Sequence, residues 1–207
     1  MENKLGFFFR HQIWLFATFI LMTTLSFQSW TKADDVTELE IEGMSIGDSA
    51  LKFFTESHIT KNTWDYPNNE FKRVQNDYMP FFKIYDAVDF HYKTKDSKYI
   101  IHSITGVLFF KKNIEDCYKK MDEIVNEIEK AFSNIKFNEK STFKHPSPNN
   151  KSGKSKVTDT FFDFQNGDRV RLSCYDYSKE HAVNQNHLAI SIDTNKFKKW
   201  LMDEAYN

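Results

Sequence analysis

The stretch from Ile114 to Phe132 constrains the fold most, because it has the periodicity of one long amphipathic helix. Its apolar side chains recur every three or four residues and so share one face. These side chains belong to Ile114, Cys117, Tyr118, Met121, Ile124, Val125, Ile128 and Phe132. Asn113 directly precedes the run and is its predicted N-cap. Such a helix must pack its apolar face on another apolar surface, which the rest of the chain has to supply.

Alternating apolar and polar residues predict strands that form this surface. The predicted strands are Phe81–Tyr92, Tyr99–Phe110, Thr158–Phe164, Arg169–Tyr175 and Leu188–Ile192. The polar turn Lys93–Lys98 joins the first two, and Asn166-Gly167, a strong signal of a tight hairpin, joins the next two. Gly106 interrupts the second strand and predicts a bulge there.

The remaining segments predict short helices and loops. Ser45 and Asp48 have the spacing of a capping box that opens a helix, and Thr194 can cap a last helix. His58–Asn76 is polar and irregular, and residues 136–156 are rich in helix and strand breakers, which predicts a flexible loop. We therefore expect an α+β fold: an antiparallel sheet of about five strands, the long amphipathic helix on one face, and short helices at both ends of the domain.

The N-terminal residues have the order of an export signal. Lys4 and Arg10 are followed by the uncharged, largely apolar run Ile13–Phe27, and small residues then lead to Ala33. Cleavage after Ala33, with Thr31 at the −3 position, would leave one domain of residues 34–207. The protein is then expected in the periplasm or outside the cell.

The alternative for the same residues is a membrane anchor that is not cleaved. A spanning helix needs about 20 apolar residues, which is longer than Ile13–Phe27, although Trp30 could lie at the membrane interface. No cysteine lies near the end of the run, so an N-terminal lipid anchor is not expected. Contact with the membrane is expected only through this segment.

Charge and cysteine content limit the function classes further. The chain has 28 Lys and Arg against 29 Asp and Glu, a net charge of −1, which does not provide the basic surface that nucleic acid requires. Its two cysteines, Cys117 and Cys174, lie on the apolar face of the predicted helix and of a predicted strand. In an oxidising compartment they can form one disulfide; two buried thiols are the alternative.

One candidate for chemistry is Ser49. Gly47-Asp48-Ser49-Ala50-Leu51 resembles the block that carries the nucleophile of GDSL-type serine esterases. Those enzymes also need a Gly-x-Asn-Asp block and a late Asp-x-x-His, and neither occurs here; Asp176 and His181 have the wrong spacing. The capping box explains the same residues without catalysis.

A second candidate is a metal site on the first hairpin. If the turn is centred near Asp96, His102 faces Asp89 and His91 lies diagonally opposite on the same face. Two imidazoles and a carboxylate can bind zinc or another divalent metal, but a slip of one residue separates them. Polar residues on an open sheet face are the alternative. No cofactor is predicted from the sequence.

Two surfaces could contact a partner. The lysines of the predicted loop could meet anionic lipid or polysaccharide, or could simply be solvated; they are Lys140, Lys144, Lys151, Lys154 and Lys156. The outward-facing aromatic residues Tyr85, Phe161, Tyr175 and Tyr177 could form a binding surface, or could be covered by a second layer of the fold.

Several sequence blocks resemble a family of small exported proteins from AT-rich marine alphaproteobacteria. The blocks are residues 28–35, 40–49, 114–121 and 164–168, and Gly43-Met44-Ser45-Ile46-Gly47-Asp48-Ser49 is the most specific part. The resemblance implies export and a single domain along most of the chain, and it implies no catalytic residue. Gly43-Met44-Ser45 also resembles the opening of small outer-membrane assembly lipoproteins, whose lipid-bearing cysteine this sequence lacks.

The sequence therefore favours an exported, non-enzymatic binding or envelope-associated module, whose partner could be an envelope protein. One alternative is a hydrolase or metal-dependent enzyme that uses Ser49 or the Asp89, His91 and His102 cluster. The other is a membrane-anchored structural protein with an uncleaved N-terminal helix.

Overall fold

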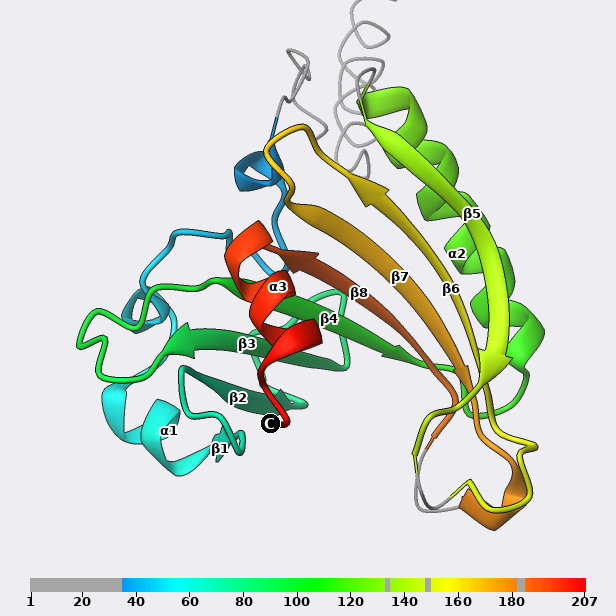
Figure 1. Ribbon diagram of the computed structural model, residues 1–207, viewed down its shortest axis with the longest axis horizontal. Coiled ribbons are helices and arrows are strands. Elements are labelled where there is room, and N and C mark those ends of the chain that lie inside the picture. Colours follow the sequence, from blue (N-terminus) through cyan, green and yellow to red (C-terminus); the bar gives the residue numbers. More distant parts are fainter. Residues whose placement is uncertain (1–34, 133–134, 148–149, 182–184) are drawn as a thin grey trace, which may run out of the picture. The chain divides into compact units, whose positions relative to one another are not determined.

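The structure of this protein is a computed structural model that describes residues 35–132, 135–147, 150–181 and 185–207 (Figure 1). These residues belong to one compact unit, Lys32–Asn207. The predicted signal segment, residues 1–33, and its cleavage site lie outside the described residues.

A single antiparallel sheet dominates the structure. Eight strands follow the spatial order β1-β2-β3-β4-β8-β7-β6-β5. They are β1 (Thr63–Asp65), β2 (Phe71–Asp77), β3 (Ala87–Lys93), β4 (Ser103–Phe109), β5 (Lys136–Lys144), β6 (Lys156–Asp163), β7 (Arg169–Asp176) and β8 (His187–Asp193). Each half of the sheet is four consecutive strands, and the two halves meet where β4 pairs with β8.

The helices are few and, except for one, short. They are η1 (Val36–Glu38), η2 (Ala50–Lys52), α1 (Glu56–Lys61), α2 (Ile114–Ala131), η3 (Lys179–His181) and α3 (Asn195–Asp203). The predicted caps Asn113 and Thr194 are confirmed, since their side chains accept hydrogen bonds from the backbone N–H of Glu115 and Phe197. The predicted helix over 114–132 is present as α2.

The predicted fold class is wrong. The sheet has eight strands in place of about five, and it contains more of the described residues than the helices do. The sequence prediction missed β1, β2 and α1 in or near the segment His58–Asn76, and β5 in the supposed loop 136–156. These elements lack a clean apolar alternation: β5 is exposed along most of its length, and β2 is covered at different points on both faces.

The predicted capping box at Ser45 and the predicted bulge at Gly106 are also wrong. Asp48 accepts a hydrogen bond from the Ser45 backbone N–H, but the 3-10 helix η2 begins later, after Ser49. Gly106 keeps regular pairing with Val88 and Ile190. A Cβ at this position would lie 2.5 Å from the Tyr85 ring, so the glycine makes room for that ring.

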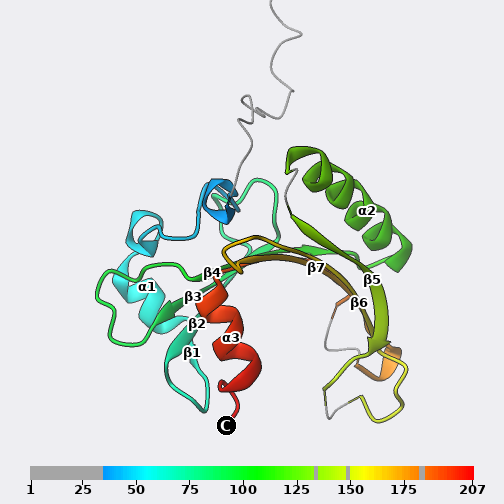
Figure 2. The ribbon, with the colours of Figure 1, turned by 45° about the horizontal axis from the view of Figure 1, so that its top comes forward.

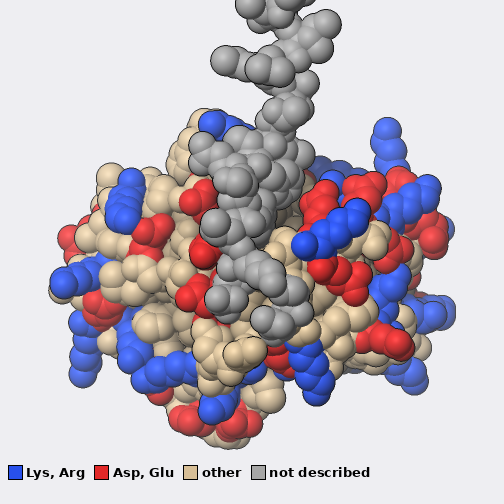
Figure 3. All heavy atoms as spheres, turned by 90° about the horizontal axis from the view of Figure 1, so that it is seen from above, with Lys and Arg blue, Asp and Glu red and all other residues tan. Residues whose placement is uncertain are grey.

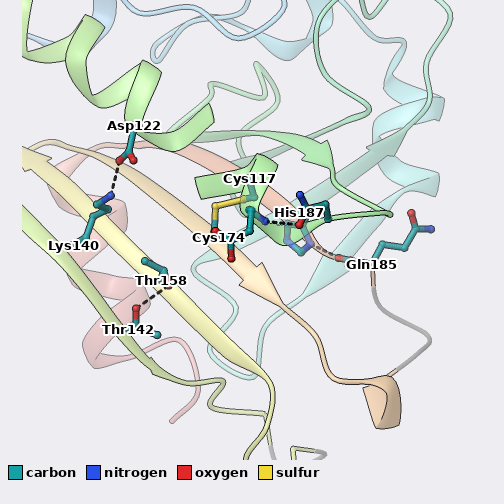
Figure 4. The surroundings of a disulfide bond; sticks show 10 residues. Cys117, Asp122, Lys140, Thr142, Thr158, Cys174, Gln185 and His187 are labelled. Atoms are coloured by element: carbon teal, nitrogen blue, oxygen red, sulfur yellow. Dashed lines mark hydrogen bonds and ion pairs between the residues drawn. A yellow bond between two sulfur atoms is a disulfide. The ribbon is translucent and has the colours of Figure 1, made fainter. Parts of the chain in front are cut away.

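The core lies on one face of the sheet. Side chains of paired residues point to the same face, so one apolar face runs across the strands; α2 covers it over β7 and β8, and the N-terminal part of the described unit covers it over β3, where Phe54 stacks on Phe90. This face includes Phe90, Ile104, Phe162, Leu172, Leu188 and Ile190. Cys117 of α2 and Cys174 of β7 form a disulfide at this interface, and both residues are fully buried (Figure 4). The predicted cysteine pair is confirmed.

The two faces of the sheet are covered differently. Figure 2 shows a curved sheet with α2 outside the curve and α3 inside it. We call the inner side the concave face. α3 covers only one part of it, where Phe197 and Trp200 pack on Phe71 of β2. On the side seen in Figure 3, acidic and basic side chains are interspersed, in keeping with the near-balanced charge.

Candidate functional site

The concave face carries polar and charged side chains, whereas the opposite face of the same strands is apolar. One continuous row crosses the middle strands through directly paired residues: Asp89 with Thr105, Thr105 with Ser191, and Ser191 with Arg171. The central hydroxyls of Thr105 and Ser191 are hydrogen-bonded at 2.8 Å. This row joins the two halves of the sheet on the concave face.

Two ion pairs lie at the ends of this row and share one geometry. Arg73 donates from Nε and Nη2 to Oδ2 of Asp89, with the Nε distance at 3.0 Å. Arg171 donates in the same way to Oδ2 of Asp159, again with 3.0 Å from Nε. The arginine side chains are 40% and 38% exposed, and their carboxylate partners only 10% and 9%. The concave face therefore presents guanidinium edges, while the carboxylates lie beneath them.

Burial and pairing set the protonation of these groups. Burial disfavours the charged form of both arginines and so acts to lower their pKa. The carboxylates beside them outweigh this effect, and the pKa of Arg73 and of Arg171 is raised above the ordinary arginine value. Burial raises the pKa of Asp89 despite the adjacent Arg73 guanidinium. Both pairs thus have arginines that remain charged and can donate further hydrogen bonds.

An aromatic strip lies beside the ion pairs, at the end of the sheet where β8 begins. It consists of Tyr78, Phe109, His187, Tyr175, Tyr177 and His145. Neighbouring ring centroids are between 4.5 and 6.1 Å apart, and the Tyr175 and His187 rings are stacked. Burial lowers the pKa of His187, so this imidazole is neutral at pH 7. The strip is therefore an ordered aromatic surface next to two cationic edges.

His91 lies on the concave face where α3 covers it. Its Nε2 is 2.9 Å from the Tyr66 hydroxyl, and its ring packs against Phe197 at 4.4 Å between centroids. Nδ1 has no hydrogen-bond partner among the described residues. Burial, with a smaller contribution from Arg73, lowers the pKa of His91 to about 3. This histidine is a neutral core residue over the physiological range.

The structure does not bring the predicted metal-site residues together. The predicted register is wrong, because Asp89 pairs with Thr105 and His91 with Ser103, while His102 lies outside β4. Asp89 binds Arg73, and the His102 ring faces Phe71 at 5.3 Å between centroids. Within the described ranges, no group of three or more His, Cys, Asp or Glu residues could hold a metal ion.

Ser49 has the contacts of a structural cap. Its hydroxyl donates to the Lys98 carbonyl at 2.6 Å and accepts from the Leu51 backbone N–H. In the part of the chain that the structure describes, no imidazole or carboxylate is hydrogen-bonded to this hydroxyl. The arrangement therefore lacks the adjacent base that activates a serine nucleophile.

The predicted aromatic and basic surfaces are divided between different regions. Phe161, Tyr175 and Tyr177 lie on the concave face, and the Arg169 guanidinium lies 3.9 Å from the Phe161 ring centroid. Tyr85 packs against the core on the opposite side, beneath Gly106. Two of the predicted loop lysines form ion pairs: Lys140 with Asp122, and Lys154 with Glu180.

The sequence prediction did not identify the concave face as one surface. The members that it missed are Arg73, its partner Asp89, Asp159, Arg171 and His187. The usable signal was the polar phase of β7, where Arg169, Arg171 and Ser173 alternate with apolar residues. Arg171 and Asp159 lie on the two strands of the predicted Asn166-Gly167 hairpin, whereas Arg73 lies on β2, which the sequence prediction missed.

Comparison with known proteins found no matching family, curated protein or solved structure. No helix within the described residues is long and apolar enough to cross a membrane. What the candidate site binds must therefore be inferred from its geometry.

Proposed function

We propose that this protein is an exported, non-enzymatic binding module whose concave face holds a protein partner. The observation that carries the proposal is the continuous surface formed by the Arg73 and Arg171 edges and the aromatic strip. Tyrosine and arginine are the side chains most enriched where protein interfaces have their binding energy, together with tryptophan. Rings held in mutual contact lose little conformational entropy when a partner binds.

Charge indicates the chemistry of that partner. The carboxylates of the two ion pairs are almost fully covered, whereas the guanidinium edges reach solvent. A complementary surface presents carboxylate or carbonyl oxygens to Arg73 and Arg171, and an apolar side chain to the aromatic strip. The partner we propose is thus a folded protein of the cell envelope with an acidic, partly apolar contact surface.

The proposed location is supported by the N-terminal sequence pattern. The Lys4 and Arg10 head, the apolar run Ile13–Phe27 and the small residues before Asp34 are typical of an export signal. The Cys117–Cys174 disulfide is compatible with an oxidising compartment. Mass spectrometry of the N-terminus of protein isolated from its cells tests this part. A start at or near Asp34 is expected.

Site-specific photocrosslinking tests the proposed surface. A photoreactive phenylalanine analogue at Tyr78, which is 59% exposed beside Phe109, is expected to crosslink to one envelope protein. The matched control position is Lys119 on α2, which is exposed on the other side of the sheet. Equal crosslinking from Lys119 would contradict the assignment of the concave face.

Once the partner has been identified and purified, its Kd for variants of this protein tests the individual residues of the concave face. Tyr177→Ala and Arg171→Lys are each expected to raise Kd about tenfold or more. Tyr177→Ala removes a packed aromatic ring, and Arg171→Lys removes the planar guanidinium with its paired N–H donors. Unchanged thermal unfolding would show that the variants are folded. An unchanged Kd in both variants would rule out this surface as the binding site.

The enzyme hypotheses make different predictions that can be checked on the same protein. Stoichiometric, tightly bound zinc would favour a metal-dependent enzyme. Labelling of Ser49 by a fluorophosphonate probe would favour the hydrolase. Either result would replace the binding module as the leading function.

A further inference from the structure

The strand β5 is the long open edge of the sheet. It pairs with β6 on one side, and among the described residues no other strand pairs with it (Figure 1). The strand at the opposite edge, β1, has only three residues, whereas β5 has nine. Alternate backbone N–H and C=O groups of an edge strand point away from the sheet and can pair with a further strand. β5 therefore offers a template about 30 Å long for strand addition.

The lysines of β5 limit which strands can use this edge. Residues 136–156 contain six lysines and one glutamate, although the whole chain has a net charge of −1. Within the described residues, Lys140 pairs with Asp122, whereas Lys136 and Lys144 form no ion pair. A second copy that paired antiparallel about Lys140 would place Lys136 opposite Lys144, and like charges in this position repel. The edge therefore disfavours pairing with itself and favours an acidic strand.

A bulge gives each side of this edge an exposed phenylalanine. Phe137 and Phe143 are six residues apart, so a regular strand would place both rings on one face. The register shift within β5 instead places Phe137 beside Phe162 on the α2 side, and Phe143 beside Val157 on the concave face. The two side chains are 37% and 41% exposed. Lysines and a bulge are enough to protect an edge, so the exposed rings are explained by a strand that packs its side chains on them.

Phe143 also connects the edge to the candidate site. Val157 pairs with Tyr175, so Phe143 extends the aromatic strip to the last strand of the sheet. We propose that an extended, acidic segment of the envelope partner adds to β5 as a ninth strand of the sheet. Its carboxylates lie beside Lys136 and Lys144, and its apolar side chains cover the two phenylalanines.

This mode of binding divides affinity and specificity between two kinds of contact. Main-chain hydrogen bonds to β5 supply affinity, and the lysine and phenylalanine side chains select the segment. The inference rests on the proposed protein partner, but it concerns a surface distinct from the Arg73 and Arg171 edges. The two surfaces can therefore be tested separately.

Photocrosslinking from the edge tests the contact with the full chain in its own cells. A photoreactive phenylalanine analogue replaces Phe143, and mass spectrometry identifies the peptide that it captures. The matched control is the same analogue at Phe81 in the loop between β2 and β3, because that side chain is 43% exposed and contacts Phe54 of the core. An acidic segment of one envelope protein is expected from position 143 and not from position 81.

Charge reversal tests the role of the lysines. Lys136→Glu/Lys144→Glu should reduce the crosslinking yield from position 143 at least about tenfold, because both cations beside the acidic segment are replaced by anions. Lys119→Glu/Lys130→Glu reverses two exposed lysines of α2 and should leave the yield unchanged. An equal reduction in the two double variants would show that only the overall charge matters, which would contradict recognition at β5.

Hydrogen exchange tests the strand pairing itself. The probe is a synthetic peptide with the sequence of the captured segment, added to the purified protein. Exchange of the backbone amides that point outward from β5 should slow at least about tenfold, because they become hydrogen-bonded. The amides of β1, at the other edge of the sheet, should exchange at an unchanged rate.

The proposal is overturned if position 143 captures no protein, a second copy of this chain or a segment without acidic residues. It is also overturned if position 81 captures the same product, or if the peptide leaves exchange in β5 unchanged. Crosslinking from Tyr78 without crosslinking from position 143 would retain the concave face and exclude the edge. The reverse result would retain the edge and contradict the concave face.

Discussion

The two faces of the same strands have opposite chemistry. On β7, Leu172 points towards α2 and is fully buried in the core, whereas its neighbour Arg171 points to the concave face and stays partly exposed. On β8, Ile190 and Ser191 show the same contrast. The face under α2 is buried by apolar contacts and linked to α2 by a disulfide, so it contributes most of the free energy of unfolding. The concave face keeps its polar groups in ion pairs and hydrogen bonds, so it can remain a surface.

The largest expected contrast is between adjacent residues of β7. Leu172→Ala removes buried side-chain volume under α2 and should lower the free energy of unfolding by about 2–5 kcal/mol. Ser173→Ala, on the concave face next to it, should change it by less than about 1 kcal/mol. Urea unfolding measures both. Similar losses in the two variants would show that the faces are equally important for stability.

The disulfide should contribute almost as much as the core leucine. It links residues separated by 57 positions, and its loss should reduce the free energy of unfolding by about 2–4 kcal/mol. The measurement compares urea unfolding of the native protein and of Cys117→Ala/Cys174→Ala. A free-thiol assay on denatured, unreduced protein is the control. Two reactive thiols per chain would contradict the bridge.

A smaller effect is expected from the ion pairs of the concave face. Arg171→Met leaves the Asp159 carboxylate buried without its cation, which should cost about 1–3 kcal/mol. Arg171→Met combined with Asp159→Leu should restore most of that loss, because no buried charge remains unpaired. Thermal unfolding of the two single variants and the double variant gives the coupling. Additive losses would show that Arg171 and Asp159 do not interact.

The last effect is spread over a pH range: the stability of the protein should depend on pH through His91. Its pKa in the folded protein is about 3, below the value near 6.5 that it has when unfolded. The unfolded chain therefore binds the additional proton, and stability falls as pH decreases from about 6.5 towards 3, by about 1.4 kcal/mol per pH unit. His91→Gln, which keeps a polar group near Tyr66, should flatten this slope. An equal slope in both proteins would show that other groups cause the acid sensitivity.

Much of the second half of the fold could be predicted from local sequence. α2, the Asn166-Gly167 hairpin and β8 each have a pattern that one packed face imposes on neighbouring residues. Cys117 and Cys174 could be paired because both lie in the apolar phase of such patterns. In contrast, β2 and β5 could not be recognised: β2 is covered by different partners on its two faces, and β5 is an edge strand with little to bury.

The sequence by itself determined the apolar N-terminal run, the amphipathic α2 and the cysteine pair that links α2 to the sheet. These features follow from residues close in the chain, where periodicity alone identifies a face. Only the tertiary structure decided the eight-strand order, the register of β3 with β4 and the composition of the concave face. The Arg73–Asp89 and Arg171–Asp159 pairs lie on one face because β4 pairs with β8, and the free energy of that pairing comes from contacts between residues far apart in the sequence, which no local pattern records.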